Sequence, residues 1–188
     1  MTVIAAAITE DEGVVLVSDS EVTSGYTKDT DGYSKLWVVN HHDYIVGGCG
    51  SVRAIQIIKH WTDWPYSHAY DNIEEFAVKG LVSRIREALS EHGALVISKK
   101  TESFDGAIVF AFEDNLIVID EDFSVSIPES GRYAIGSGQS EALGSLGNEG
   151  PWTKDDVIES ARRATITALG VGGPLWIVST KYSAVEQI

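Results

Sequence analysis

With 188 residues, of which 44% are apolar, the chain has the length and composition of one compact domain with an ordinary hydrophobic core. Its 28 acidic and 14 basic side chains give a formal net charge of -14, which argues against binding to nucleic acid or to an anionic membrane through basic patches. Cys49 is the only cysteine, so an internal disulfide and a cysteine-based zinc site are excluded, and a reducing, cytoplasmic location is expected.

The first predicted element is a β-hairpin that begins at residue 2. Residues 3–8 and 14–17 are short aliphatic and β-branched runs, and the polar residues 10–13 between them suit a turn. Neither strand alternates polar with apolar residues, so we expect both faces of their sheet to be covered. Residues 20–34 are rich in Gly, Ser, Thr and Asp, which is typical of an exposed loop near a site.

A second hairpin is predicted next, with strands at 36–39 and 44–46. A glycine-rich turn follows it, and Ser51 is a suitable N-cap for a helix that runs to Trp61. Apolar residues then recur at helical spacing from 73 to 89, which predicts a long amphipathic helix closed by Gly93.

The remaining elements separate strands from helices along the chain. We expect an antiparallel meander of three strands at 106–112, 115–119 and 123–127. After it come a strand at 132–135, helices at 140–146 and 153–169, and a last strand at 175–180. This segregation favours a layered α+β fold over a doubly wound parallel sheet, within a single domain spanning 1–188.

Thr2 is the first residue that could carry chemistry. It becomes the terminal residue once an aminopeptidase removes Met1, and its α-amine is then free. An α-amine with a pKa of about 7.7 to 8.0 is partly neutral near neutral pH, so it can accept the hydroxyl proton of its own residue. Taken alone, a Met-Thr beginning is equally consistent with no such activity.

Asp19 and Lys35 flank the predicted loop, and both lie next to the first strand if the two hairpins pack as one sheet. A Lys ammonium near the amine favours the neutral amine and stabilises a developing alkoxide, while a carboxylate holds the Lys charged and oriented. Ordinary exposed charges would show the same sequence pattern.

Gly50 and Ser137 each lie between a predicted strand and a predicted helix. The backbone N–H of Gly50 could approach an oxyanion at the positive end of the following helix. The hydroxyl of Ser137 could hydrogen-bond the terminal amine and relay protons. A turn glycine and an N-cap serine are the alternatives for the same residues.

Together these positions resemble proteasome β subunits and the bacterial proteasome-like peptidase HslV. Residues 2–5 resemble the mature N-terminal strand of that family, and residues 14–20 resemble its apolar run ending in Asp. Residues 34–36 are similar to its catalytic lysine motif, at the family's spacing of sixteen after the Asp. Residues 48–51 resemble its Ala-Gly-Gly oxyanion turn, and residues 133–138 resemble its Ala-Ile-Gly-Ser-Gly run.

The resemblance implies a four-layer αββα sandwich and homo-oligomeric subunits assembled in stacked rings around an inner chamber. It implies a threonine endopeptidase that cleaves peptides or unfolded proteins. The implied catalytic roles are nucleophile and general base for Thr2, electrostatic activator for Lys35, its partner for Asp19, oxyanion donor for Gly50 and proton relay for Ser137. The implied specificity pocket is roomy and mainly apolar, and its lining residues are Val22, Tyr33, Gly48 and Val52.

The sequence departs from the family in two places. The turn at 10–13 is one residue longer than in the relatives that it resembles most. Proteasome β subunits carry a supporting Asp and Ser near the C-terminus, where this chain has Ala168 and Val171. HslV-like proteins also lack that pair, so the departure bears on classification more than on activity.

Two other functions stay open on the sequence alone. One is a ring-forming scaffold or binding protein that has kept the fold and lost hydrolysis. The other is a small-molecule amidohydrolase with an open pocket. We expect no metal and no cofactor, because the five histidines show no ligand spacing and no phosphate-binding Gly-rich loop is present. Unfolding of protein substrates would require a separate ATPase.

Overall fold

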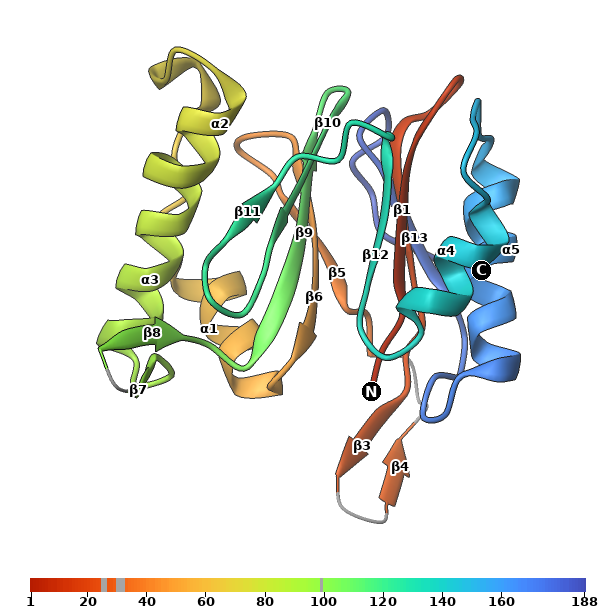
Figure 1. Cartoon of the computed structure of the whole chain (residues 1–188), viewed down its shortest axis with the longest axis horizontal. Coiled ribbons are helices and arrows are strands. Elements are labelled where there is room, and N and C mark those ends of the chain that lie inside the picture. The colour runs from red at the N-terminus through yellow and green to blue at the C-terminus, as the bar shows by residue number, and fades with distance from the viewer. Residues whose placement is uncertain (25–26, 30–32, 99) are drawn as a thin grey trace.

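The computed structural model describes residues 1–24, 27–29, 33–98 and 100–188, and two stacked five-stranded antiparallel sheets lie at its centre (Figure 1). The first sheet has the strand order β12-β1-β2-β13-β14. Its strands are β1 (Ile4–Thr9), β2 (Gly13–Ser18), β12 (Arg132–Ile135), β13 (Trp176–Ser179) and β14 (Glu186–Gln187).

The second sheet has the strand order β11-β10-β9-β6-β5. Its strands are β5 (Leu36–Val39), β6 (Tyr44–Gly50), β9 (Gly106–Phe112), β10 (Asn115–Ile119) and β11 (Val125–Ser126). The predicted meander is therefore confirmed, with a shorter third strand than expected. Two small hairpins complete the strands: β3 (Val22–Ser24) with β4 (Thr27–Asp29), and β7 (Val96–Ser98) with β8 (Thr101–Ser103).

Helices cover the outer face of each sheet, which makes the fold a four-layer αββα sandwich (Figure 1). On the second sheet lie α1 (Val52–Trp61) and a helical stretch composed of α2 (Ile73–Glu75), the π-helical η2 (Phe76–Leu81) and α3 (Val82–Glu91), with the 3-10 turn η1 (Ser67–Ala69) before it. On the first sheet lie α4 (Gln139–Leu146) and α5 (Lys154–Thr167). The predicted α+β class is confirmed. Within the described ranges, no helix combines the length and the apolar character needed to span a membrane.

The local signals at the helix ends behave as the sequence predicts. Ser51 caps α1 through a bond that its side chain accepts from the Ala54 amide. Thr153 opens α5 with a reciprocal capping box to Asp156. These caps satisfy N–H groups that a helix leaves without internal partners, so they set where each helix begins.

Strand β1 is buried on both faces, and the stacked layers explain its uninterrupted apolar sequence. Ile4 and Ala6 contribute to the core between the two sheets, whereas Val3, Ala5 and Ala7 contribute to the core under α4 and α5. Successive side chains of a strand point to opposite faces, so a strand between two cores has no polar face. The expectation of covered faces is confirmed.

The two predicted hairpins do not pack as one sheet, so the condition under which the sequence placed Asp19 and Lys35 next to the first strand is not met. The β1–β2 hairpin belongs to the first sheet, and the β5–β6 hairpin belongs to the second. They face each other across the inner core, where Leu16 of β2 and Leu36 of β5 meet in one apolar cluster. Hydrophobic stacking, and not strand pairing, therefore brings the two hairpins together.

Three other local features differ from the sequence-based prediction or were absent from it. The predicted loop 20–34 contains the β3–β4 hairpin, although residues 25–26 and 30–32 of that loop lie outside the described part of the chain. The β7–β8 hairpin was not predicted. His42, in the turn of the second hairpin, is half-buried because its ring packs against Tyr44 and Tyr66.

Candidate active site

Antiparallel pairing gathers the predicted catalytic residues at one end of the sandwich. Thr2 precedes β1, whereas Asp19 follows β2 and Ser137 follows β12, and both of those strands run antiparallel to β1. In the opposite sheet, Lys35 precedes β5 and Gly50 ends β6, its antiparallel partner. The start of one strand lies beside the end of its antiparallel neighbour. The predicted residues of each sheet therefore lie at the same end of the sandwich.

Thr2 is buried and is held by the turn between β12 and α4. Its backbone N–H donates to Ser137 Oγ at 3.1 Å, and its carbonyl oxygen accepts from Gly138 N at 3.1 Å and from Ser137 Oγ at 3.3 Å. Gly136 has φ of +90°, and a Cβ added there would overlap the Thr2 carbonyl. Only glycine combines that conformation with so close an approach, which explains the Gly-Ser-Gly sequence of the turn.

Asp19 and Lys35 form a buried ion pair across the two sheets. Lys35 Nζ lies 2.6 Å from Asp19 Oδ1, and the side chains are 6% and 0% exposed. The same carboxylate accepts backbone N–H bonds from Val3 at 3.0 Å, from Glu21 at 3.3 Å and from Gly172 at 3.2 Å. Asp19 therefore ties β1, the β2–β3 connection and the α5–β13 connection to the lysine.

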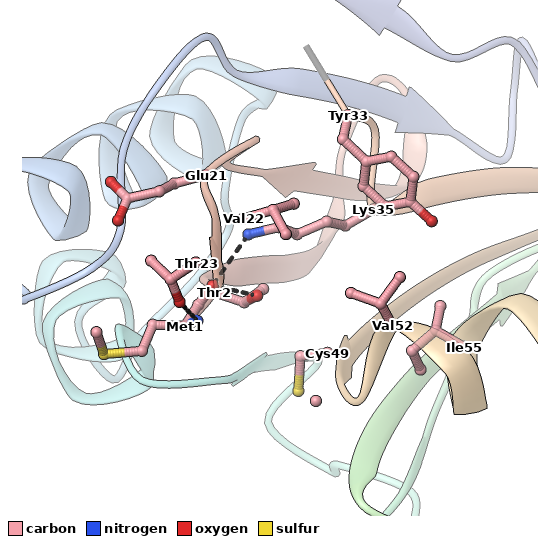
Figure 2. Close-up of a pocket in the computed structure, with 12 residues that line it drawn as sticks. Met1, Thr2, Glu21, Val22, Thr23, Tyr33, Lys35, Cys49, Val52 and Ile55 are labelled. Atoms are coloured by element: carbon pink, nitrogen blue, oxygen red, sulfur yellow. Dashed lines mark hydrogen bonds between the residues drawn. The ribbon is translucent and has the colours of Figure 1, made fainter. Parts of the chain in front are cut away.

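The Lys35 ammonium also reaches the residue before the proposed nucleophile. It donates to the Met1 carbonyl oxygen at 3.2 Å, and Thr2 Oγ1 donates to that same oxygen at 2.7 Å (Figure 2). Burial lowers the pKa of Lys35, against the opposing effect of the Asp19 carboxylate. The site thus places a desolvated cation and a hydroxyl on one peptide carbonyl.

A cavity of about 60 Å³ opens beside Thr2 and Lys35. Val22, Val52 and Ile55 lie on one side of Thr2 with Tyr33, as Figure 2 shows, and Tyr33 and Val52 remain 41% and 43% exposed at the surface. The residues that line the cavity are Met1, Thr2, Glu21, Val22, Thr23, Tyr33, Lys35, Gly48, Cys49, Gly50, Val52 and Ile55.

The structure brings the sequence-predicted residues into two overlapping groups. Thr2, Asp19, Lys35 and Ser137 share one hydrogen-bond network with Met1. The four predicted pocket residues and Gly50 line the cavity together with Thr2 and Lys35. The structure shows only that Gly50 lies beside the cavity. Its role as an oxyanion donor therefore stays a prediction.

Sequence reasoning missed four residues that line the same cavity. Two of them, Glu21 and Thr23, lie close together in the sequence. Glu21 is 4% exposed, and its carboxylate lies 3.2 Å from Lys28 Nζ. Ile55 is three residues after Val52 on α1, so helical spacing could have indicated it. Cys49 is half-buried at the cavity, and burial raises the pKa of its thiol.

The two family positions that differ in this chain lie on the connection from α5 to β13. Ala168 is the C-cap of α5, and Val171 is buried in the core under α4 and α5. The connection still reaches the site, because the backbone N–H of Gly172 donates to Asp19 at 3.2 Å. A main-chain group therefore supports Asp19 from this segment.

Comparison with solved structures identifies the architecture. A eukaryotic HslV from Trypanosoma brucei superimposes with a TM-score of 0.72 at 20% identity, covering 94% of this chain and 97% of that one. A mutant of Anbu from Hyphomicrobium sp. strain MC1 gives 0.72 at 16% identity, covering 100% and 87%. BPH from Thiobacillus denitrificans, in complex with epoxomicin, gives 0.68 at 19% identity, covering 100% and 98%.

The chain has an HslV-like, proteasome-type N-terminal-nucleophile hydrolase fold. No protein-family model matches the sequence, and no curated protein matches it either. At identities of 16–20% these likenesses establish the fold alone. The predicted family resemblance and the four-layer sandwich of the proteasome-type fold are thereby confirmed.

Proposed function

We propose that this chain, after loss of Met1, is a threonine endopeptidase subunit in which Thr2 is both nucleophile and general base. One observation carries the proposal: Thr2 Oγ1 and Lys35 Nζ donate to the same carbonyl oxygen, at 2.7 and 3.2 Å, while Thr2 N lies 3.1 Å from Ser137 Oγ. A hydroxyl, a buried cation and a nitrogen with a hydroxyl partner are the groups that an N-terminal nucleophile requires.

The proposed reaction is acyl transfer through an ester. The free Thr2 amine takes the hydroxyl proton as Oγ1 attacks the substrate carbonyl carbon, and the Lys35 ammonium stabilises the developing negative charge on oxygen. The C–N bond then breaks, and the amine returns the proton to the leaving nitrogen. In the second half, the amine takes a proton from water, the resulting hydroxide attacks the ester carbon, and the proton returns to Oγ1 as the acid leaves.

Each remaining residue has a supporting role in this proposal. Asp19 keeps Lys35 charged and in place, Ser137 orients the Thr2 nitrogen, and the Gly50 amide is the expected donor to the oxyanion. The side chain before the cleaved bond enters the cavity lined by Val22, Tyr33, Gly48 and Val52. Gly48 has no side chain and the other three residues are apolar or aromatic, so we expect a preference for a large apolar residue there.

The second candidate function, a non-hydrolytic ring-forming scaffold, applies to a chain that keeps Met1. In that form the Thr2 nitrogen is an amide, which has no basic lone pair for the hydroxyl proton, and Oγ1 is engaged with the Met1 carbonyl at 2.7 Å. Removal of Met1 is therefore the step that distinguishes the two candidates.

Assembly and partners belong to the proposal as well. We propose homo-oligomeric stacked rings, because HslV and proteasome homologues, which share this fold, form them. Peptide or unfolded-protein substrates and a separate ATPase unfoldase are part of the same proposal. Native mass spectrometry and electron microscopy of the purified protein measure the assembly directly. A monomeric particle would contradict the ring assembly and would favour the small-molecule amidohydrolase.

Three proteins test the peptidase proposal: the unchanged sequence, Thr2→Ala, and, as a matched control, Thr9→Ala at the last residue of β1, the strand that Thr2 precedes. We expect the mature N-terminus to be Thr2, hydrolysis of fluorogenic peptides with a large apolar residue before the cut, and an epoxomicin adduct on Thr2. Thr2→Ala is expected to show neither hydrolysis nor adduct, whereas Thr9→Ala keeps both. Equal hydrolysis by Thr2→Ala, or full retention of Met1 in an active protein, would contradict the mechanism.

A further inference from the structure

A second cavity, of about 490 Å³, lies at the opposite end of the sandwich from Thr2. Residues of the β5–β6, β9–β10 and β13–β14 connections line it. Gly50 pairs with Gly106 at the start of β9, beside the candidate active site, whereas the second cavity contacts Phe112 at the other end of that strand. In Figure 1 the β9–β10 turn lies at the end of the molecule away from the N-terminus. We call this space the turn cavity, and the proposed peptidase mechanism does not use it.

Two carboxylates of the turn cavity have no counter-ion in the described part of the chain. Among these residues, neither Asp43 nor Glu113 forms an ion pair or a side-chain hydrogen bond. Lys181 also lines the cavity, and its Nζ donates to the Asp11 carbonyl oxygen at 2.8 Å. Burial lowers the pKa of His42 at the same cavity, so its ring is neutral near neutral pH. The lining therefore carries a net negative charge, which attracts a cation.

Glu113 occupies a turn position where the backbone conformation is unfavourable for a glutamate. Phe112 pairs with Asn115, so the β9–β10 turn has two residues, and φ at Glu113 is +50°. Glycine, asparagine and aspartate are preferred at such positions, because other side chains raise the energy of the left-handed region. Asp43 and Ser183, on the other two connections, also have positive φ, at +55° and +44°. Strained residues cluster at ligand-binding sites, so a bound cation accounts for a carboxylate at this position.

Tyr182 supplies an aromatic surface to the same cavity. The residue is 63% exposed, and Lys181 Nζ lies 5.4 Å from the centroid of its ring. This contact shows that the ring accepts a cation, and the exposed remainder of the ring is open to a ligand. A guanidinium group stacks on aromatic rings and donates in a planar fork that matches carboxylates, whereas a lysine ammonium is a compact and strongly hydrated charge. The combination of a ring and two carboxylates therefore suits arginine.

We propose that the turn cavity binds an arginine side chain, whose guanidinium donates to the carboxylates of Glu113 and Asp43 and stacks on Tyr182. The net charge of -14 on the chain assists the approach of a basic ligand. An arginine within a peptide and the free amino acid present the same guanidinium, so both sources are tested. Binding at the turn cavity is independent of peptidase activity, because its lining residues differ from those of the cavity beside Thr2.

The test measures the dissociation constants of N-acetyl-arginine amide, of its uncharged citrulline analogue and of free L-arginine, by ligand-observed saturation-transfer NMR. This method suits an assembly of any size, and a Thr2→Ala protein is used so that the probes are not hydrolysed. We expect the arginine amide to bind about tenfold more tightly than the citrulline amide, because only the guanidinium makes charge-assisted hydrogen bonds. Comparable binding of L-arginine assigns recognition to the side chain alone, whereas binding of L-arginine only assigns the site to the free amino acid. Either result supports the site.

Glu113→Gln and Asp114→Asn are a matched pair, because each removes one negative charge from the same two-residue turn and Glu113 is the one that lines the cavity. Glu113→Gln should weaken binding of the arginine amide by about threefold or more, and Tyr182→Leu by a similar factor. Asp114→Asn should leave the affinity unchanged. Equal affinity for the arginine and citrulline amides would overturn the proposal, because the charge would then not be recognised. Equal losses in Glu113→Gln and Asp114→Asn would overturn it as well, because net charge alone would then explain the effect.

Discussion

Two lysine–carboxylate pairs in this molecule have the same N–O distance of 2.6 Å and opposite surroundings. Lys35 and Asp19 lie between the sheets with side chains 6% and 0% exposed, whereas Lys79 and Glu75 lie one turn apart on the outer helical stretch at 70% and 25%. Burial lowers the pKa of Lys35, while the hydrogen bond to Glu75 raises the pKa of Lys79. At the same N–O distance, the Lys35–Asp19 pair holds a desolvated cation, whereas the Lys79–Glu75 pair is a solvated surface ion pair.

This difference shows why distance alone is a poor guide to function. Removing a charge from water costs free energy, which the partner and further hydrogen bonds must offset. Asp19 offsets the cost of burying Lys35 and accepts three backbone N–H groups as well. The outer pair has water around Lys79, so it needs no such network.

The largest expected effect is on stability, from breaking the buried pair. Asp19→Ala leaves Lys35 buried without its partner and three backbone N–H groups without their acceptor, so we expect a loss of about 3–5 kcal/mol in the free energy of unfolding. Urea unfolding of wild type and Asp19→Ala measures this loss in the free energy of unfolding. Glu75→Ala is the control and should leave the unfolding midpoint nearly unchanged, because Lys79 is solvated without its partner. Equal unfolding midpoints for Asp19→Ala and Glu75→Ala would contradict the proposed difference between the buried and the exposed pair.

The next effect is on catalysis. Lys35→Met keeps the length of the side chain and removes the cation that faces the carbonyl at Thr2, so kcat should fall by about 10²- to 10³-fold. Steady-state hydrolysis of a fluorogenic peptide measures this change, with Lys79→Met as the matched control at wild-type activity. Undiminished activity of a folded Lys35→Met protein would exclude an electrostatic role for this lysine.

The smallest effect is a pH dependence of opposite sign at the two lysines. For Lys35 the folded-state pKa lies below the ordinary 10.5, so the unfolded chain binds more protons between these values and stability rises with pH there. For Lys79 the folded-state pKa lies above 10.5, so its contribution is complete below that pH and is lost as pH rises through the folded value. Activity should fall where Lys35 loses its proton.

Unfolding of wild type, Lys35→Met and Lys79→Met, measured on both sides of pH 10.5, separates the two signs, because the Lys35 effect lies below that pH and the Lys79 effect lies above it. The rise in stability with pH that belongs to Lys35 should be missing in Lys35→Met and present in Lys79→Met. A slope that is the same in all three proteins would mean that neither lysine titrates differently in the folded and unfolded states.

Much of the site could be predicted because a hairpin brings residues that are near in the sequence close together in space. A strand, a tight turn and a returning strand place Thr2 and Asp19 at the same end, and the bond from Val3 N to Asp19 at 3.0 Å shows how close they come. The Gly-Ser-Gly turn could be recognised for a similar reason, since its glycine is required by contact with Thr2. The hairpin and the turn each involve only one or two secondary-structure elements, so the sequence pattern is enough to indicate them.

Other features could not be predicted because they depend on contacts between distant elements. The sequence left open whether the two hairpins share one sheet, and they stack in two sheets, since the apolar faces of both have to be buried. Glu21, Thr23 and the Gly172 amide approach the site only through the folding of the β3–β4 hairpin and the α5–β13 connection. No periodicity in the sequence indicates such approaches.

The sequence by itself determined the layered α+β class, the caps of α1 and α5, and a set of residues that resembles proteasome-type enzymes. These follow from local rules, in which side-chain pattern and turn chemistry select strands, helices and their ends. Only the tertiary structure decided that Lys35 meets Asp19 across two sheets, and that a carbonyl, a hydroxyl and an ammonium converge beside Thr2. The physical reason is that stacking of the two sheets buries both charges, and burial is a property of the whole fold.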